Sequence, residues 1–342
     1  MSVSIKDIAR AAGVSPSTVS RALHDHPRIS QETKNQIRQL AHELGYTPSL
    51  LARSLVTRHT ATVGMVITTA SDPFLARLVQ GVEETAERNG YSVFLGSSYR
   101  DGERELEVVR SFHERRASGV IVTGSQIDDG YLHLCDQFAL PIVLTNCRTY
   151  PYSVYVDKVS GARQAVEHLL QLGHQRVAFI GGKRSHRSRL ERLTGYRQVL
   201  EETGIPLDDS FVLDGEGTLA SGIMAAGQIL AMSQPPTAIF CFNDLTAIGV
   251  IRGLNQANAE VPRDYSVVGF DDLEMASYYC PPLTTVHQPT HQLGQCAINM
   301  LLKLIRGESN PQPERLPAEL VIRASTGPVS NGPWSLTSSR PI

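Results

Sequence analysis

The chain has 342 residues, 41% of them hydrophobic, which is enough for two or three domains with apolar cores. Its net charge of −2 conceals an asymmetry: residues 1–60 hold 8 Lys+Arg and 4 Asp+Glu, and the other residues hold 24 and 30. A basic head on an acidic body suits a polyanion-binding module joined to a soluble sensor, although chance would explain the asymmetry equally well. There is no stretch of roughly 20 apolar residues and no CxxC or Cys/His cluster. These absences argue against a membrane protein, a disulfide scaffold and a zinc protein.

The first 46 residues predict three short helices around a small core. The helices are expected over Ile5–Ala12, over Pro16–Leu23, and from the residue after Ser30 to about Leu44. Ser4 and Ser15 are suitable N-caps, Asp7 can complete a capping box with Ser4, and Gly45 can end the third helix. The second helix carries small polar side chains and Arg21, a composition that can enter the major groove of DNA.

Residues 47–61 predict a further short helix and a linker. Thr47 can cap this helix and Pro48 can open it. Over Ser49–Val56 it would have two turns at most, which is too short to be stable alone. Thr57–Ala61 is polar and is expected to be a linker.

From Thr62 the pattern changes to alternating strands and helices. The expected strands are Val63–Thr68, Tyr91–Gly96, Gly119–Val122, Pro141–Leu144, Val177–Ile180, Ala238–Cys241 and Tyr265–Phe270. The expected helices are Phe74–Arg88, Arg104–Arg115, Lys158–Leu172, Leu193–Thr203, Ser221–Met232 and Leu245–Gln256. This order is typical of a doubly wound α/β fold repeated in two halves, whose ligands bind beyond the carboxyl ends of the strands. The Ser/Pro/Gly-rich tail from Gly327 is predicted to be disordered.

Several segments resemble the LacI/GalR family of bacterial transcription regulators. They are SIKDIARAAGVSPSTVSRAL, GYTPSLLARSL, DPFLARLVQGVE, HLLQLGHQRVAFIGG, ERLTGYRQVLEE, TAIFCFNDLTAIGV, YSVVGFDD and PPLTTVHQP, within residues 3–325. The resemblance implies a helix-turn-helix domain over 1–46, a hinge helix and linker over 47–61, and a two-subdomain, periplasmic-binding-protein-like α/β core over 62–326. The N-subdomain would comprise 62–157 and 288–316, and the C-subdomain 158–287 and 317–326, followed by the tail over 327–342.

The resemblance also implies which residues contact DNA. Pro16, Ser17 and Arg21 fall where the family's recognition helix reads the major groove, and Arg21 would donate two hydrogen bonds to a guanine. Phosphate contacts would come from Ser4, Thr18 and Asn35. For Thr18 the alternative is an ordinary position on the helix surface.

The hinge positions that match the family's DNA contacts are Ala52, Ser54, Leu55 and Val56. A leucine at the Leu55 position wedges into the central base step from the minor groove, one from each protomer, which favours a flexible CG or CA step. The alternative is that Leu55 packs on the core. A hinge of two turns would form only when DNA and the partner hinge bury it, so it would act as an order–disorder switch.

The family binds a small effector between the two core subdomains. The matching positions are Asp72, Phe74, Asn146, Arg189, Arg192, Asn243 and Asp271. Carboxylate, amide and guanidinium groups can bind pairs of hydroxyls and an aromatic ring can cover a sugar face, so a sugar-like effector is implied. The alternatives are that Asn243 and Asp271 are helix N-caps and that Phe74 belongs to the core.

Two departures from the family pattern bear on the effector. Gly217 stands where several sugar-sensing members carry an aromatic residue, so one sugar-stacking wall is expected to be missing. Cys147 stands where the purine-sensing member stacks a base, which disfavours a purine. A basic loop at the cleft mouth contains Lys183, Arg184, His186, Arg187 and Arg189. It would suit an acidic or phosphorylated sugar, but a solvated loop is the favoured interpretation.

The favoured function is a cytoplasmic, homodimeric repressor of carbohydrate uptake or catabolic genes. It would bind a palindromic operator and respond to a sugar-like effector, with no cofactor or metal and no membrane partner. An enzyme is disfavoured because GGKRS lacks the features of a phosphate loop and because GxSxG and HExxH are missing. A transport-type sugar-binding protein is disfavoured by the DNA-reading head and by the lack of a secretory signal.

Overall fold

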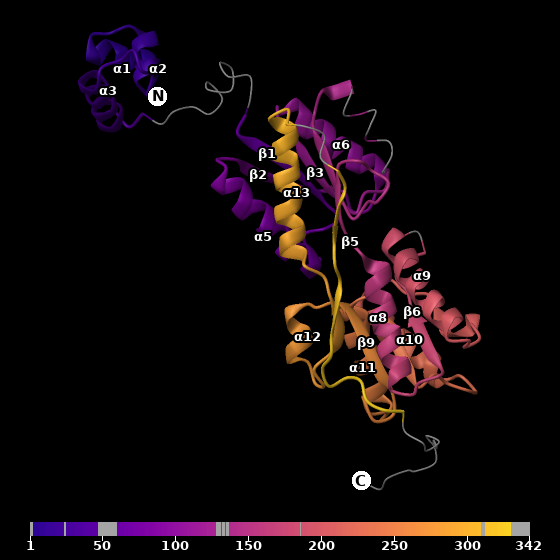
Figure 1. Ribbon diagram of the computed structural model, residues 1–342. Helices are drawn as coiled ribbons and strands as arrows, with labels where there is room; N and C mark the ends of the chain where they lie inside the picture. The colour runs from indigo at the N-terminus through magenta and orange to yellow at the C-terminus, as the bar shows by residue number, and fades with distance from the viewer. Residues whose placement is uncertain are drawn as a thin grey trace. The chain divides into compact units, whose positions relative to one another are not determined.

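The computed structural model describes residues 3–23, 25–46, 60–127, 131, 134, 137–184, 186–308 and 312–329. The chain forms two compact units, residues 1–60 and residues 61–342 (Figure 1). The predicted hinge helix, with Ala52, Ser54, Leu55 and Val56, lies outside the described residues. No helix in the described ranges is long and apolar enough to cross a membrane.

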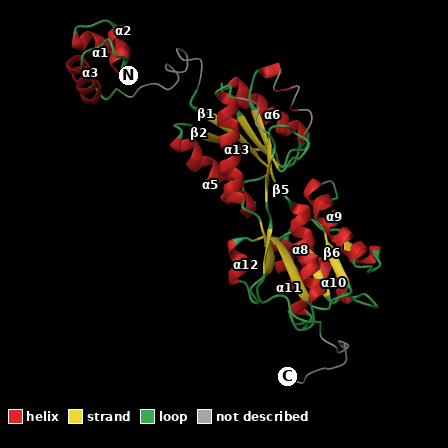
Figure 2. Cartoon of the chain, in the orientation of Figure 1, coloured by secondary structure: helices red, strands yellow, loops and turns green. Residues whose placement is uncertain are grey.

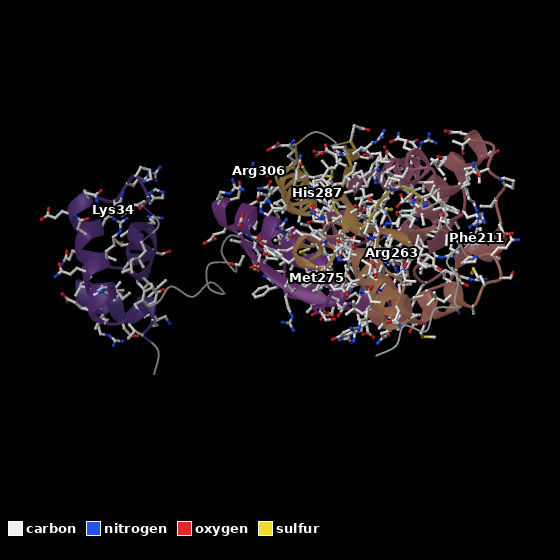
Figure 3. The ribbon with its side chains drawn as sticks, turned by 90° about the horizontal axis from the view of Figure 1, so that it is seen from below. Lys34, Phe211, Arg263, Met275, His287 and Arg306 are labelled. Atoms are coloured by element: carbon white, nitrogen blue, oxygen red, sulfur yellow. The ribbon has the colours of Figure 1, made fainter. Side chains whose placement is uncertain are left out.

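The described residues of the first unit form three helices, α1 (Ile5–Ala12), α2 (Pro16–Leu23) and α3 (Gln31–Glu43). The expected caps are in place: the backbone N–H of Ser4 donates to Asp7 at 3.0 Å, and the backbone N–H of Thr18 donates to the Ser15 hydroxyl at 3.2 Å. The core contains Ile8, Val19 and Ile37, all with no exposed surface. Lys34, labelled in Figure 3, is largely buried, and its Nζ donates to the carbonyl of Asp25 at 3.2 Å.

The second unit contains two six-stranded sheets among its described residues (Figure 2). The first sheet has the order β11 (Glu314–Leu316), β5 (Ser153–Val156), β4 (Ile142–Thr145), β3 (Val120–Thr123), β1 (Thr62–Ile67) and β2 (Ser92–Ser97). The second has the order β12 (Glu319–Val321), β10 (Thr284–His287), β9 (Ser266–Asp271), β8 (Ala238–Cys241), β6 (Val177–Ile180) and β7 (Val212–Leu213). All pairings are parallel except that of β10 with β12. The central strands are continuous buried apolar runs, as expected for parallel sheets covered on both faces.

Helices pack on both sheets. The first sheet carries α5 (Pro73–Arg88), α6 (Gly102–Glu114) and α13 (Thr290–Ile305); the second carries α8 (Lys158–Gln171), α9 (Arg187–Glu202), α10 (Leu219–Leu230), α11 (Asp244–Gln256) and α12 (Glu274–Tyr278). Figure 1 shows α13, far along the chain, beside β1 and β3. Glycines allow α13 to approach α5 closely: a Cβ added at Gly294 would lie 2.2 Å from the carbonyl oxygen of Leu78.

The chain passes between the two sheets at three places, each directly after the end of a strand. β5 leads into α8 through Asp157, β10 leads into α13 through Gln288, and β11 leads directly into β12. The first and third passages are tied together, because the backbone N–H of Asp157 donates to the carbonyl of Leu316 at 3.0 Å and its carboxylate pairs with Arg315.

Two sequence predictions of local structure need correction. α9 begins at Arg187, six residues before the predicted start at Leu193, because Arg189 and Arg192 are buried and an apolar pattern does not detect them. The predicted disordered tail begins too early. The backbone N–H of Gly327 donates to Ser266 at 3.0 Å, and that of Val329 donates to the carbonyl of Leu172 at 3.0 Å. Residues 330–342 lie outside the described part.

Candidate functional site: an exposed helix and a polar pocket

The second helix of the first unit presents its predicted DNA contacts at the surface. Pro16, Ser17 and Arg21 are exposed, and Thr18 is half-buried. The hydroxyls of Ser17 and Thr18 lie 2.8 and 2.9 Å from that of Ser15, so they are held at the first turn of α2. The long Arg21 side chain leaves the last turn of the same helix. An exposed helix of this kind can offer a guanidinium and hydroxyls to base edges.

The two further predicted phosphate contacts sit on neighbouring helices. Ser4 is exposed at the start of α1, but its hydroxyl donates to Asp7 at 2.7 Å. These bonds from Ser4 lower the pKa of Asp7. Asn35 is exposed on α3 and accepts a hydrogen bond from Gln31 at 3.1 Å. Ser4 therefore has a capping role of its own, and Asn35 keeps its amide N–H groups at the surface.

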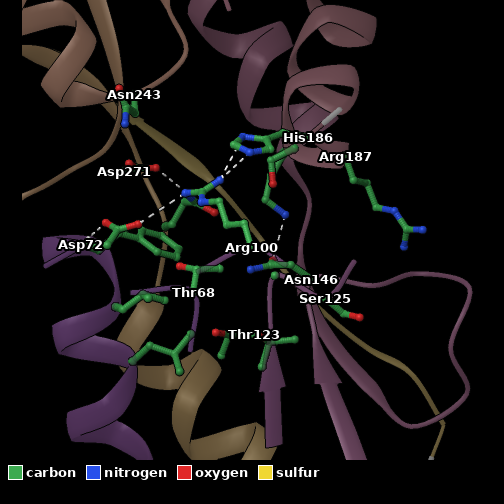
Figure 4. A pocket seen from close by; sticks show the side chains of 18 of the residues that line it. Thr68, Asp72, Arg100, Thr123, Ser125, Asn146, His186, Arg187, Asn243 and Asp271 are labelled. Atoms are coloured by element: carbon green, nitrogen blue, oxygen red, sulfur yellow. Dashed lines mark hydrogen bonds and ion pairs between the residues drawn. The ribbon is translucent and has the colours of Figure 1, made fainter. Parts of the chain in front are cut away.

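A pocket in the second unit lies beyond the carboxyl ends of strands from both sheets (Figure 4). Six of the seven predicted effector residues line it: Asp72, Phe74, Asn146, Arg192, Asn243 and Asp271. Asn146 directly follows β4, and Asp271 ends β9. This is the place at which doubly wound folds bind ligands, because side chains that follow parallel strands converge there.

Several lining residues adopt left-handed backbone conformations that are uncommon for residues other than glycine. The φ angles are 62° at Arg100, 61° at Asn146 and 119° at Asp271. Each follows or ends a strand; Asn146 and Asp271 are of the residue types that adopt positive φ most readily after glycine, whereas Arg100 is not. Backbone strain of this kind gathers at ligand-binding sites, where it directs side chains that an extended strand would point elsewhere.

A buried ion pair forms the floor of the pocket. Arg192 Nη2 donates to Asp271 Oδ1 at 3.1 Å, and Gln288 Nε2 donates to the same oxygen at 2.7 Å. The guanidinium of Arg192 lies 4.4 and 4.0 Å from the ring centres of Phe242 and Phe270, so cation–π contacts hold it flat. Burial raises the pKa of Asp271 to about 7, while the charge of Arg192 opposes that rise.

Asp72 and Asn243 each serve a helix as well as the pocket. Asp72 Oδ1 accepts the backbone N–H of Phe74 at 3.1 Å and caps α5. Asn243 Oδ1 accepts the backbone N–H of Thr246 at 2.9 Å and caps α11, while its Nδ2 donates to the carbonyl of Gly217 at 3.0 Å. Asn243 is therefore the N-cap of α11, as the alternative predicted, and it also lines the pocket.

The neighbouring Asp244 lies outside the lining but supports it. Thr285 Oγ1 donates to Asp244 Oδ1 at 2.5 Å, and the backbone N–H of Leu273 donates to Oδ2 at 2.7 Å. Burial raises the pKa of Asp244 well above its usual value, with a further rise from the charge of Asp271. Asp244 thus holds the turn after β9 that presents Asp271 to the pocket.

The sequence reasoning missed several residues that line the pocket. Lys158 is almost wholly buried, donates to Asn146 at 2.8 Å and pairs with Glu191 at 3.3 Å; burial lowers its pKa. Arg100, Phe242 and Gln288 were also not predicted. Three buried polar atoms of the lining have no hydrogen-bond partner among the described residues: Thr145 Oγ1, Arg192 Nε and Gln288 Oε1. Such atoms are costly to bury and are suited to bind a ligand.

Arg189 is the exception among the predicted effector residues. Its Nη2 donates to Asp214 at 2.8 Å, so its side chain serves that carboxylate instead of the pocket. Most of the basic loop is similarly committed: Lys183 pairs with Glu216 at 3.0 Å, and Arg184 pairs with Asp214 at 2.6 Å. His186 and Arg187, by contrast, line the pocket. Arg187 is exposed and His186 is half-buried, so the solvated-loop interpretation stays a prediction although these two residues also line the pocket.

The structure shows what surrounds Gly217 and Cys147, the two positions at which the sequence departs from the family pattern. A Cβ at Gly217 would lie 3.3 Å from the ring of Phe242, so the phenyl ring of Phe242 fills the space beside this position. Phe74 and Phe242 together give the pocket two aromatic rings. Cys147 is buried outside the lining, and its Sγ lies 3.0 Å from Arg187 Nη1.

A three-helix head with an exposed second helix, joined to a two-sheet core with a polar pocket, defines a ligand-responsive DNA-binding regulator. Residues 4–49 match the family described as bacterial regulatory proteins, lacI family, and residues 166–326 match a periplasmic binding protein-like domain. The HTH-type transcriptional repressor PurR of Photobacterium profundum is 35% identical, over 94% of this chain and 98% of its own. The chain therefore belongs to the lacI family of DNA-binding transcriptional repressors.

Solved structures agree with this assignment. The lac repressor dimer bound to operator and the anti-inducer ONPF is 29% identical with a TM-score of 0.89, covering 96% of this chain and 100% of that one. The complex of the transcriptional regulator CelR with cellobiose is 29% identical with a TM-score of 0.72, covering 94% and 99%. The family and the fold class predicted from the sequence are confirmed.

Proposed function

We propose that this regulator is a cytoplasmic homodimer that represses carbohydrate uptake or catabolic genes and that a small polyhydroxylated effector in the pocket controls its hold on a palindromic operator. The observation that carries the proposal is the set of buried polar atoms around the pocket. Asp271, Gln288 and Thr145 supply acceptors, and Arg192 supplies donors, some of them without a partner among the described residues. A polyol can satisfy donors and acceptors at once.

The aromatic rings fit the same class of ligand. Phe74 and Phe242 can cover the apolar face of a pyranose while Asp72, Asn146 and Asn243 bind its edge hydroxyls. The related CelR structure contains cellobiose, which is in keeping with a sugar here. The relatives are transcriptional regulators and the polar groups of the lining are explained by ligand binding, so we propose no catalytic activity.

A purine base is the second candidate. The similarity to repressors named PurR favours it, and two phenyl rings could stack on a planar base. The buried cations do not distinguish the two classes, because Arg192 already pairs with Asp271 and Lys158 with Glu191. The unpartnered atoms Thr145 Oγ1, Arg192 Nε and Gln288 Oε1 favour a polyol, whose several hydroxyls can each donate and accept. Both ligand classes therefore belong in the same binding assay.

The homodimer is supported by exposed apolar side chains on two elements of the core. Phe94 and Leu95 are 57% and 46% exposed on β2, which is an edge strand of the first sheet. Ile223 and Met224 are 37% and 69% exposed on α10. A hydrophobic edge strand invites pairing or aggregation unless a partner covers it. A second copy of the chain is the partner that a palindromic operator requires.

Effector binding would act through the passages between the two sheets. The pocket draws its lining from both sheets, so a ligand that binds better to a closed arrangement shifts the core toward closure. A coupling of about 1–3 kcal/mol, typical of allostery, would change operator affinity roughly 5–150-fold. A binding profile measured with and without the effector determines whether the effector weakens or strengthens operator binding.

The test is an in vitro binding profile of the purified protein on fragmented DNA from its own source, repeated with sugars, sugar derivatives and purines. We expect one palindromic motif with a central CG or CA step, upstream of sugar uptake or catabolic genes, and a change in its occupancy with one ligand class. Enrichment upstream of purine genes with a response to a purine would replace the sugar proposal. A sequence preference with no palindrome would contradict the homodimer.

A further inference from the structure

The pocket holds more positive charge than negative charge. Its lining includes the cations Arg100, Lys158, Arg187 and Arg192 and the carboxylates Asp72 and Asp271. Arg192 pairs with Asp271 at 3.1 Å, and Lys158 pairs with Glu191 at 3.3 Å. Arg100 is held less closely, because its Nη2 lies 3.9 Å from Asp72 Oδ2, near the limit of an ion pair. Among Arg100, Lys158 and Arg192, Arg100 is therefore the cation whose charge is least compensated.

Arg100 makes its shortest contacts with another basic side chain. Its Nη1 lies 2.7 Å from Nε2 and 3.0 Å from Nδ1 of His186 (Figure 4). Burial and the charge of Arg100 lower the pKa of His186 to about 4, so the imidazole is neutral near pH 7. The neutral imidazole has one unprotonated ring nitrogen, so an N–H of the Arg100 guanidinium can donate to it. This contact fixes the guanidinium without compensating its charge, and the remaining N–H groups of Arg100 can donate to the oxygens of an anion.

His186 is also the N-cap residue of α9, directly before the helix begins at Arg187. α9 has 16 residues, no acidic side chain in its first turn, and no side-chain cap from His186 in the described structure. Arg187 and Ser188 of that turn line the pocket. The free N–H groups and the dipole of a helix N-terminus favour an anion. A second observation on the same helix points to a ligand: Arg192 is 3% exposed, lines the pocket, and has an Nε without a partner among the described residues.

The backbone before Arg100 is arranged to deliver its side chain to this place. Tyr99 and Arg100 have φ angles of 52° and 62°, two consecutive left-handed residues. The backbone N–H of Tyr99 donates to the carbonyl of Thr68 at 2.8 Å, which fixes the turn against the end of β1. Strain of this kind persists where the surrounding structure imposes it, and it marks sites at which side-chain direction matters.

We propose that the effector is anionic and that its phosphate or carboxylate group binds between Arg100 and the N-terminus of α9. The proposal rests on the proposed function, since it names the class of effector for the same pocket. Asp271 and Gln288 would bind the hydroxyls while Arg100 binds two oxygens of the anion in a bidentate contact. Arg100 follows the first sheet and α9 belongs to the second, so the anion joins the two and couples binding to closure.

The test measures matched ligands on the full-length protein by titration calorimetry in chloride buffer at fixed ionic strength. Each neutral sugar is titrated beside its own phosphate ester and its own sugar acid, and inorganic phosphate is titrated alone. We expect the anionic member of a pair to bind at least about tenfold more tightly, as a hydrogen bond to a charged group predicts, and inorganic phosphate to bind measurably. The ester and acid arms identify which anion the site takes.

Two variants connect the preference to Arg100. Arg100→Gln should abolish the tenfold preference and the binding of inorganic phosphate. Arg184→Gln removes the same charge from the basic loop, where it pairs with Asp214 outside the lining, and should keep both within about twofold. A far-ultraviolet spectrum and a melting curve of each variant establish that it is folded.

Three results would overturn the inference: a neutral sugar that binds as tightly as its ester and acid, inorganic phosphate that fails to bind, or phosphate binding unaffected by Arg100→Gln. If a neutral sugar or a purine binds and alters operator affinity, this inference fails while effector control by the pocket stands. If Asp271→Asn leaves every bound ligand and its effect on DNA unchanged, the pocket is not the effector site and the proposed function itself fails.

Discussion

Several polar side chains around the pocket do two tasks at once. Asp72 and Asn243 cap α5 and α11, and Asp271 neutralises the buried Arg192. A ligand hydroxyl that binds one of these side chains therefore competes with the hydrogen bond that caps the helix, or with the ion pair to Arg192. This is why a substitution in the lining tests both stability and binding, and why conservative changes are the informative ones.

Asp271→Asn is the most direct test of the pocket. The amide keeps the shape of the side chain but cannot neutralise Arg192, so we expect effector affinity to fall about 100-fold and stability to fall by about 3 kcal/mol, as for a broken buried ion pair. Operator affinity without effector should be kept. Asp272→Asn is the control, because that carboxylate pairs with His287 and Arg323 away from the lining. Equal losses in the two variants would contradict a ligand-binding role for Asp271.

His186 should remain neutral to unusually low pH. Its folded pKa of about 4 lies below the ordinary value of 6.5, so neutral His186 favours the folded state above pH 6.5, and that advantage is lost as the pH falls through 4. Nuclear magnetic resonance titration of the imidazole should find its midpoint near pH 4 and, in Arg100→Gln, at a higher pH. A midpoint near 6.5 in the wild type would show that in solution the imidazole is neither buried nor in contact with Arg100.

Arg21 should read one base pair. Arg21→Ala should weaken binding to the preferred operator by about 1–3 kcal/mol and relax the preference at a single half-site position, because a bidentate contact to guanine is lost. Arg10→Ala is the control: Arg10 is exposed on α1, where it pairs with Asp7 at 3.5 Å. It should weaken binding to all sequences alike or not at all. A selection of randomised DNA distinguishes the two, and an unchanged motif for Arg21→Ala would refute the assignment.

The pocket was predictable only in part. Six lining residues followed from the family resemblance, because they sit in recognisable motifs at strand ends. Arg100 could not be found in this way, since its position depends on a left-handed turn after β2 that no spacing reveals. Arg189 lies three residues before Arg192, on the same face of α9, and this spacing suggested that both line the pocket. The side chain of Arg189, one turn earlier, reaches Asp214 instead.

At the scale of helices and strands, strong apolar runs were predictable and weak ones were not. β6 and β8 have the predicted bounds, and the other predicted strands shift by about one residue. β10 was missed because it is short and threonine-rich, and its partner β12 has three residues. α13 was missed although it has 16 residues. Pro289 at its start provides no side-chain cap in the described structure, so no capping signal marks the helix, although exposed Gln292, Asn299 and Lys303 give it a polar face.

Two helical glycines should respond in opposite directions to alanine. A Cβ at Gly294 would lie 2.2 Å from the backbone of Leu78 on α5, so Gly294→Ala must push the two helices apart and should destabilise the core by about 2 kcal/mol or more. Gly227 on α10 has nothing within 4 Å of an added Cβ, so Gly227→Ala should stabilise by about 0.5–1 kcal/mol. Thermal unfolding measures both. A stable Gly294→Ala would mean that the α5–α13 contact is looser than described.

At the scale of the whole molecule, the three passages between the sheets and the pocket form one system. Asp157 joins two passages through Leu316 and Arg315, and its carboxylate also binds Arg148 at 2.8 Å. Gln288, at the third passage, donates to Asp271 in the pocket. A ligand that reorganises Asp271 therefore acts directly on a segment that connects the sheets. In the proposed function, this is the physical route by which effector binding would change the relative arrangement of the two sheets and so, in the proposed homodimer, operator affinity.

That mechanism requires a dimer, and β2 offers the place to break it. Leu95 is 46% exposed on an edge strand, so Leu95→Lys puts a charge into the proposed interface and should convert the dimer to monomers at micromolar concentration. Operator affinity should then fall on the order of 100-fold, because the two half-sites no longer bind as one unit. Leu207→Lys changes a similarly exposed leucine, 43%, in the loop after α9 and should leave both properties intact. Sedimentation velocity and operator titration report the two effects together. A wild-type monomer would remove the homodimer from the proposal. A dimeric Leu95→Lys protein with full operator affinity would place the interface on another surface, and the exposed apolar side chains of α10, such as Met224, are the next candidate.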